Sequence, residues 1–197
     1  MLIAAARLPL TFDAPALEAD LRVIERDGWS PHFNTQYYAG EWSGIPLRSN
    51  STTGPLYIDP SRPDDFTDLP CFASARHLRA VVAAFEAPVR AVRLLKLAPG
   101  AVIREHRDGG LRSEDGEMRV HVPIRTNPDV EFFLGGRPIP LLPGECWYLN
   151  VDLPHHAANR GSCDRVHLVL DLVVNRWVEA MLASCEETAI HAEAIGA

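Results

Sequence analysis

Hydrophobic and polar residues follow a strand-like rhythm over the second half of this 197-residue chain. From Val89 onward, short apolar runs alternate with turn residues such as Pro99-Gly100, Gly109-Gly110 and Pro143-Gly144. Short strands separated by Gly and Pro turns are typical of an all-β sandwich or barrel. About eight strands are predicted, the number in a jelly roll: VRAVRLLKL, AVIREHRD, MRVHVPI, VEFFL, RPIPLL, CWYLN, HHAAN and VHLVLDLVV.

Helical patterns flank this β-rich region. After a first strand, Asp13 can cap a helix that stops at Gly28, because apolar residues recur on one side of the segment between them. Residues 74–86 carry the clearest helical spacing in the chain. A last helix is expected from about residue 176 to 187. The predicted fold class is therefore mainly β with flanking α-helices.

Composition places the chain among soluble globular proteins. Its length suits a single domain, taken as residues 1–197 with a core at 89–175, and its 47% hydrophobic and 23% charged residues are ordinary values. A net charge of −7 argues against non-specific nucleic-acid binding, and no apolar run approaches the roughly 20 residues that cross a bilayer. The apolar start is read as a strand rather than a signal peptide, since no basic residue precedes it. Scattered cysteines without a CxxC pair indicate reduced thiols and a cytoplasmic location: Cys71, Cys146, Cys163 and Cys185.

Residues 29–70 combine many turn-forming residues with aromatic ones. Disordered segments lack such aromatics, so we expect short strands and long loops here. The aromatic side chains either pack in the core or line a substrate cleft. His32, His77 and His191 have no supporting pattern and are read as surface or packing residues.

Candidate chemistry begins with His106 and Asp108. Residues two apart on an extended backbone face the same side, so the imidazole and the carboxylate lie together. A distant histidine would complete a set of two histidines and one carboxylate, which leaves coordination positions open and suits non-haem Fe(II). The downstream pair His155-His156 offers this third ligand, and the pattern alone does not decide between its two members.

Two later strands each place a cation and an imidazole on one face. Alternation puts Arg119 beside His121, and Arg165 beside His167. Charged groups that face inward from apolar strands must be satisfied, and a pocket for a dianion would satisfy both pairs. Trp147 is read as a core residue, whereas Arg104 and Arg107 are solvated charges or contacts for a substrate carboxylate.

This combination indicates a reaction class. The planar fork of an arginine binds a carboxylate through two hydrogen bonds. A 2-oxo acid could chelate the metal through two oxygens while an arginine holds its far carboxylate. Three protein ligands and two cosubstrate oxygens then leave one position for O2, which favours an oxygenase over a closed structural zinc site.

Residues 90–175 resemble the aspartyl/asparaginyl β-hydroxylase family of Fe(II)/2-oxoglutarate dioxygenases and the related bacterial cis-proline hydroxylases. The matching stretches are RLLKLAPGAVIREHRD, MRVHVPIRTNP, LPGECWYLNVDLPHHAAN and DRVHLVLD. The resemblance implies a double-stranded β-helix, Fe(II), 2-oxoglutarate and O2, with succinate and CO2 as co-products.

The resemblance also implies roles for single residues. His106 and Asp108 match the first two iron ligands, and His155 matches the third because Asn159 and Arg165 follow it at the family's spacing. His156 is the alternative third ligand. Arg165 matches the residue that binds the far carboxylate of 2-oxoglutarate, and the cosubstrate-binding set is expected to include Arg165, Arg119, His121 and His167. Asp108 departs from the mammalian member, which has Gly there, and agrees with the bacterial pattern.

We therefore expect a dioxygenase that hydroxylates a C–H bond of an amino acid or an amino-acyl substrate. Two other classes remain open: a non-catalytic metal-binding barrel, and a metal-dependent isomerase or hydrolase on a cupin-like barrel. The substrate, the carbon that is hydroxylated and the oligomeric state do not follow from the sequence.

Overall fold

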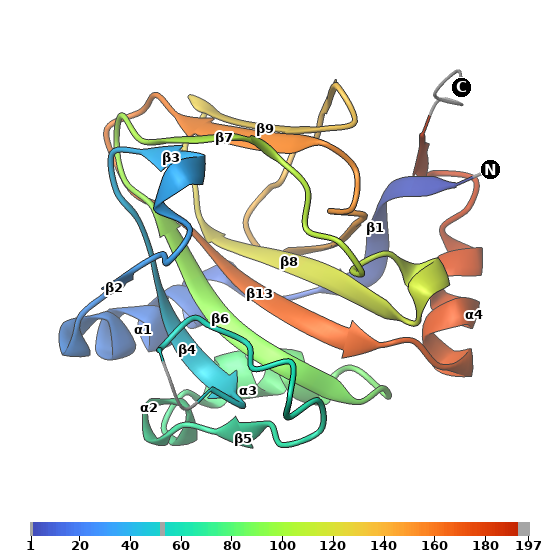
Figure 1. Cartoon of the computed structure of the whole chain (residues 1–197), viewed down its shortest axis with the longest axis horizontal. Coiled ribbons are helices and arrows are strands. Elements are labelled where there is room, and N and C mark those ends of the chain that lie inside the picture. Colours follow the sequence, from blue (N-terminus) through green and yellow to red (C-terminus); the bar gives the residue numbers. More distant parts are fainter. Residues whose placement is uncertain (1, 52–53, 193–197) are drawn as a thin grey trace.

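Two antiparallel β-sheets face each other, and helices cover the outer side of the larger sheet (Figure 1). This computed structural model describes residues 2–51 and 54–192. Within those residues, the larger sheet has nine strands in the order β14-β1-β11-β8-β13-β6-β4-β2, with β5 paired to β4. The smaller sheet has five strands in the order β10-β9-β12-β7-β3.

Most strands are short, and each ends at a turn or a loop. The larger sheet contains β1 (Ile3–Thr11), β2 (Ser30–Pro31), β4 (Trp42–Ser49), β5 (Thr67–Asp68), β6 (Val89–Leu97), β8 (Glu117–Arg125), β11 (Glu145–Leu149), β13 (Arg165–Val173) and β14 (Ile190–His191). The smaller sheet contains β3 (Tyr38–Ala39), β7 (Val102–His106), β9 (Val130–Leu134), β10 (Arg137–Pro138) and β12 (His155–Asn159).

The eight predicted strands and the predicted first strand, β1, are all present, and further strands extend both sheets. Two predictions were clearly too long: AVIREHRD contains the five-residue β7, and in RPIPLL only Arg137 and Pro138 pair, with β9. Pro138 and Pro140 lack the backbone N–H that a longer ladder would need. The mainly β architecture with flanking helices is as predicted.

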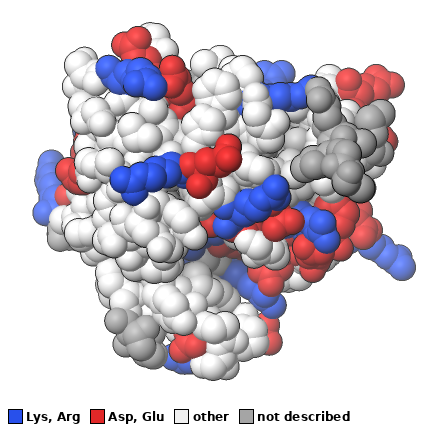
Figure 2. Space-filling view, turned by 45° about the horizontal axis from the view of Figure 1, so that its top comes forward, with Lys and Arg blue, Asp and Glu red and all other residues white. Residues whose placement is uncertain are grey.

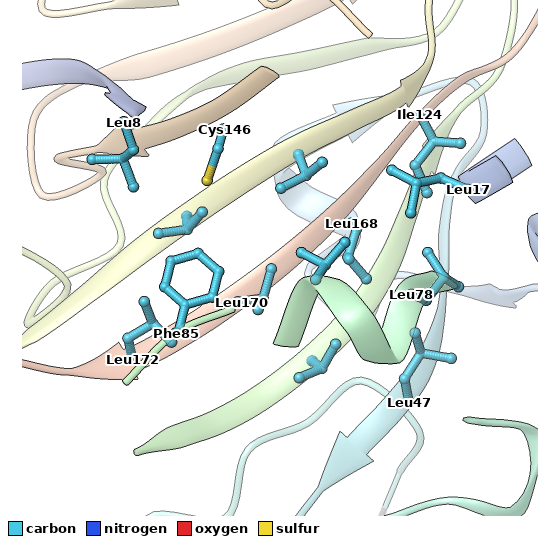
Figure 3. Close-up of a cluster of buried hydrophobic side chains, with 14 of the residues drawn as sticks. Leu8, Leu17, Leu47, Leu78, Phe85, Ile124, Cys146, Leu168, Leu170 and Leu172 are labelled. Carbon is cyan, nitrogen blue, oxygen red and sulfur yellow. The ribbon is translucent and has the colours of Figure 1, made fainter. Parts of the chain in front are cut away.

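Alternation along the central strands separates two kinds of surroundings. In β13, Val166, Leu168 and Leu170 join the apolar cluster beneath the helices, whereas Arg165 and His167 lie on the opposite face. Figure 3 shows this cluster, in which Leu168 and Leu170 meet residues of the helices and of β8. The face that is turned toward the smaller sheet thus carries Arg165 and His167 beside a second apolar cluster, which includes Leu97, Leu149 and Phe132.

The helices follow the predicted order, with different bounds at two of them. Helix α1 (Ala14–Ile24) is capped by Asp13 and continues through the 3-10 turn η1 (Glu25–Asp27) to Gly28, as predicted. The helix expected at residues 74–86 is present as the shorter α3 (Arg76–Ala83), and an additional short helix that was not predicted, α2 (Pro70–Ala73), precedes it. Helix α4 (Arg176–Ser184) ends three residues before the expected bound.

A contact with α1 determines where α3 starts. Asp20 in α1 accepts hydrogen bonds from the backbone N–H groups of His77 and Leu78, at 2.6 and 3.0 Å. These N–H groups lie in the first turn of α3 and would otherwise lack partners. Two further 3-10 turns, η2 (Thr35–Tyr37) and η3 (Ser113–Asp115), lie in loops. Among the helices of the described residues, none has the length and apolar character needed to span a membrane.

Candidate metal centre

His106 and His155 are brought together by strand pairing. They lie directly opposite each other on β7 and β12, and their ring centroids are 4.2 Å apart. Asp108 follows the end of β7, where its backbone N–H donates to the carbonyl of Val151 at 2.8 Å. Its carboxylate thereby turns back, and Oδ1 lies 3.8 Å from His106 Nε2. One ligand atom from each of the three side chains lies within 4.8 Å of the other two.

Backbone carbonyls set the orientation of both imidazoles. His106 Nδ1 lies 2.8 Å from the Arg104 carbonyl oxygen, and His155 Nδ1 lies 3.0 Å from that of Leu153. Because a carbonyl only accepts, each Nδ1 carries the hydrogen and each Nε2 keeps its lone pair for a metal. Burial lowers the pKa of His155 to about 4, so its ring is neutral at physiological pH.

A chain of alternating charges extends from Asp108. Its Oδ2 accepts a hydrogen bond from Arg119 Nη1 at 2.5 Å. Arg119 also donates to the buried carboxylate of Asp171 through Nε at 2.7 Å and Nη2 at 3.1 Å. Asp171 accepts a further bond from Arg93 Nη2 at 2.6 Å. Arg119 therefore holds one oxygen of Asp108 and leaves the other beside His106.

The charges in this chain stabilise one another against burial. Burial acts to raise the pKa of Asp171, but the Arg119 and Arg93 guanidinium groups lower it to about 2. Asp108 also has a lowered pKa: burial acts to raise it, and the positive charge of Arg119 is the largest effect that lowers it. Both carboxylates are ionised at neutral pH, which is the form that a metal ligand needs.

Arg165 has a different environment. It is 2% exposed, and no carboxylate of the described residues lies within 4.0 Å of its guanidinium. Its Nε donates to His167 Nε2 at 3.0 Å, and His167 Nδ1 lies 3.2 Å from His121 Nδ1. Burial lowers the pKa of Arg165 to about 9, and burial also lowers the pKa values of His121 and His167 well below the ordinary value. A buried cation flanked by neutral histidines is an environment that favours an anionic ligand.

The three candidate metal ligands and the buried Arg165 line one and the same cavity. His106, Asp108 and His155 line it together with Arg119, His121 and Arg165. His167 stands behind Arg165 and borders a separate hollow. The cosubstrate contact expected for Arg119 stays a prediction, because its guanidinium is already hydrogen-bonded to two carboxylates.

His156 lies differently from its neighbour. Its ring stacks on Phe133 at 4.9 Å, and Nδ1 lies 3.9 Å from a Glu105 carboxylate oxygen. It borders the cavity but does not belong to the close group of three. The geometry thus favours His155 as the third ligand.

The other predicted residues have structural contacts. Trp147 is 7% exposed, and its Nε1 donates to Glu145, as expected for a core residue. Arg104 and Arg107 are exposed and donate to the Gln36 and Asp152 carbonyls. Asn159 donates to the carbonyls of Leu97 and Cys163 and so ties β12 to the neighbouring loops.

Sequence reasoning missed two residues of the site, Arg93 and Asp171, and it gave Trp42 only the general expectation for the aromatic residues of 29–70. Asp171 continues the same alternating face as Arg165 and His167, so its inward direction was readable. Its partner was not, because the pairing of Asp171 with Arg119 depends on the register between β13 and β8. His32 is a packing residue as predicted, but its ring lies 3.6 Å from that of Trp42 and borders a pocket.

The donor set suits a catalytic transition metal. Two imidazoles and one carboxylate, with open space beside them, match the ligands of non-haem Fe(II). The cavity holds a buried cation as well. Fold and site together are therefore those of a jelly-roll protein with a candidate metal centre and a buried cation in one cavity.

Comparison with known proteins identifies the family. The chain belongs to the aspartyl/asparaginyl β-hydroxylase family, whose model matches residues 14–174. It is 26% identical over 178 residues to L-proline cis-4-hydroxylase of Rhizobium meliloti (strain 1021), which covers 89% of this chain and 63% of that protein. The chain thus spans less than two thirds of the length of this curated relative.

Solved structures confirm the predicted double-stranded β-helix. A Pseudomonas putida prolyl-4-hydroxylase aligns with TM-score 0.52 and 13% identity, covering 88% of this chain and 94% of that one. HygX from Streptomyces hygroscopicus, solved with nickel and 2-oxoglutarate bound, aligns with TM-score 0.53 and 13% identity, covering 88% and 84%. At such identities the likeness concerns the fold alone.

Proposed function

We propose that this protein is an Fe(II)- and 2-oxoglutarate-dependent dioxygenase that hydroxylates a C–H bond of an amino acid or amino-acyl substrate. The observation that carries the proposal is Arg165, a buried cation without a carboxylate partner among the described residues, in the cavity that His106, Asp108 and His155 also line. Family membership and the proline hydroxylase relative support the same reaction.

Each side chain has a role in this proposal. His106, Asp108 and His155 hold Fe(II), and Arg165 binds the far carboxylate of 2-oxoglutarate. His167 orients the Arg165 guanidinium, and the neutral His121 lies behind it. Arg119 occupies one oxygen of Asp108, which favours binding of the metal through the other oxygen alone.

Bound Fe(II) would supply the oxidation in which substrate C–H, O2 and 2-oxoglutarate give C–OH, succinate and CO2. The side chains of the protein bind and orient the substrate and the cosubstrate, and they exclude water from the site. Apolar residues of the cavity wall, Leu95, Ile103 and Phe132, shield the reacting atoms from solvent.

Succinate release tests the proposal. Protein incubated with Fe(II), ascorbate, O2 and labelled 2-oxoglutarate is expected to form labelled succinate with a panel of free amino acids, their N-acylated forms and short peptides. Asp108→Ala is expected to abolish turnover, whereas Asp68→Ala, which changes an exposed carboxylate on β5, keeps it. No succinate with the wild-type protein would favour a non-catalytic metal-binding barrel. Metal-dependent isomerisation or hydrolysis without succinate would favour the cupin-like alternative.

We also propose a cytoplasmic location and a small-molecule partner. The four cysteines are free thiols, which supports a reducing compartment. On the face shown in Figure 2, Lys and Arg side chains lie next to Asp and Glu side chains. A mixed surface of this kind supports a small substrate rather than nucleic acid.

A further inference from the structure

A second pocket adjoins the candidate metal cavity on its Asp108 side. Trp42, Leu95, Asp108 and Arg119 line both spaces. A molecule in the second pocket therefore lies beside the carboxylate ligand without occupying the Arg165 site. Under the proposed function, this is the place from which a substrate C–H bond can reach the metal.

The pocket is polar at its inner end and apolar at its outer end. The buried Arg93 and Leu56 and the half-buried Arg119 and Asp108 form the inner end, whereas Tyr57, Ile58 and Phe33 line the outer part. These outer residues come from two loops that are far apart in sequence. A pocket of this kind suits an amphiphilic ligand whose polar end lies inward.

Aromatic rings connect the outer end to the metal cavity. Phe33 stacks on His32 with centroids 4.7 Å apart and planes at 20°, and His32 stacks on Trp42 at 3.6 Å and 9°. Burial lowers the pKa of His32 to about 4, so the stack is uncharged at neutral pH. Tyr57 meets Phe33 edge-on, with centroids 6.1 Å apart.

The outer two rings are unusually exposed. Phe33 is 53% and Tyr57 is 38% exposed, and no other aromatic residue among residues 2–51 and 54–192 is a large exposed hydrophobic side chain. Both point to one pocket and touch each other there. Two exposed rings at the mouth of a cavity form an apolar surface that a bound ligand can cover.

We infer that the substrate is an amino acid with a large apolar or aromatic side chain, and that Phe33 and Tyr57 select that side chain at the pocket mouth. The inference rests on the proposed function. Phe33 and Tyr57 are specificity-determining residues that lie beyond the reacting carbon. A small substrate such as alanine leaves both rings exposed and gains nothing from them.

A graded substrate series tests the inference. L-alanine, L-valine, L-leucine, L-phenylalanine and L-tryptophan are titrated calorimetrically into protein with Fe(II) and 2-oxoglutarate without O2. Succinate release with O2 then gives KM and kcat for each. Affinity is expected to rise along the series, by about three- to tenfold for each of the two rings that the substrate side chain covers.

Substitutions at the pocket mouth distinguish a loss of substrate selectivity from a general loss of activity or folding. Phe33→Ala and Tyr57→Ala are expected to raise KM for phenylalanine by about three- to tenfold with kcat and the alanine KM unchanged. Phe33→Tyr and Tyr57→Phe, which keep the rings, restore the phenylalanine KM. Val23→Ala, which changes an equally exposed side chain on α1 outside the pocket, leaves every value unchanged.

Contrary outcomes are distinct. Equal affinity for alanine and phenylalanine, or a Phe33→Ala variant that weakens both alike, would overturn the inference. A change of oligomeric state in the same variants would show that the rings bind a second copy of the chain, and would also overturn it. Succinate that forms without any preference along the series leaves the proposed function standing while the inference falls.

Discussion

Asp171 is expected to control metal binding although it does not touch the metal site. It accepts three hydrogen bonds, from Arg119 Nε and Nη2 at 2.7 and 3.1 Å and from Arg93 Nη2 at 2.6 Å. Asp171→Asn keeps the volume but leaves the buried Arg93 guanidinium without its anion and leaves Arg119 with Asp108 alone. Removing one partner of a buried ion pair costs about 3–5 kcal/mol. We expect a loss of unfolding free energy of about 3 kcal/mol, because the amide oxygen still accepts one bond.

Asp171→Asn should also leave the carboxylate of Asp108, the proposed metal ligand, less firmly oriented. Asp171 fixes the Arg119 guanidinium, and Arg119 in turn holds Oδ2 of Asp108. Loss of a group that orients a metal ligand typically weakens metal binding by roughly 10- to 100-fold. We expect a reduction in that range for Co(II) or Fe(II), measured by titration against a competing chelator under anaerobic conditions.

Two matched variants make the result specific. Arg93→Met also breaks a contact of Asp171 but leaves the Arg119 fork in place, so metal affinity should stay within about threefold of wild type. Asp68→Asn breaks an exposed pair with Arg48 and should cost less than about 1 kcal/mol. If Asp171→Asn lowers stability but keeps metal affinity within about threefold, the positioning role of Asp171 is wrong.

Two further predictions concern histidines. His155→Ala should abolish Co(II) binding, whereas His156→Ala, whose ring stacks on Phe133, should retain it; comparable losses in both would contradict the choice of ligand. For the metal-free protein, unfolding free energy should fall as the pH drops from 6.5 toward 4. Burial lowers the pKa of His32 to about 4, so the unfolded chain binds a proton over this range that the folded chain does not. His32→Phe should reduce that loss in urea denaturation at pH 7 and pH 4.5, and an unchanged loss would refute the contribution of His32.

The β core was predictable because local signals determine it. Gly and Pro turns delimit the runs, and three strands, β6, β9 and β12, have the predicted bounds. The bounds of the helix predicted at 74–86 were not predictable in the same way. Helix α3 begins where Asp20, 57 residues before His77, satisfies the first N–H groups, and no local pattern shows that contact.

The site was predictable to a similar degree. Alternation placed Arg119, His121, Arg165 and His167 on inward faces, and the structure has all four there. The partners of these side chains depend on strand register. Arg119 and Asp171 are directly opposite on β8 and β13, and this pairing distinguishes Arg119 from Arg165, which has no carboxylate partner among the described residues.

Anaerobic titration of 2-oxoglutarate tests the central claim most directly. One molecule should bind per Fe(II), and binding should be lost when the metal is removed. Arg165→Ala removes the buried cation that holds the far carboxylate, and truncating such a charge pair costs about 2–5 kcal/mol, or roughly 30- to 4,000-fold in Kd. Binding of equal strength without metal, or in Arg165→Ala, would contradict the account of this cavity as an iron and 2-oxoglutarate site.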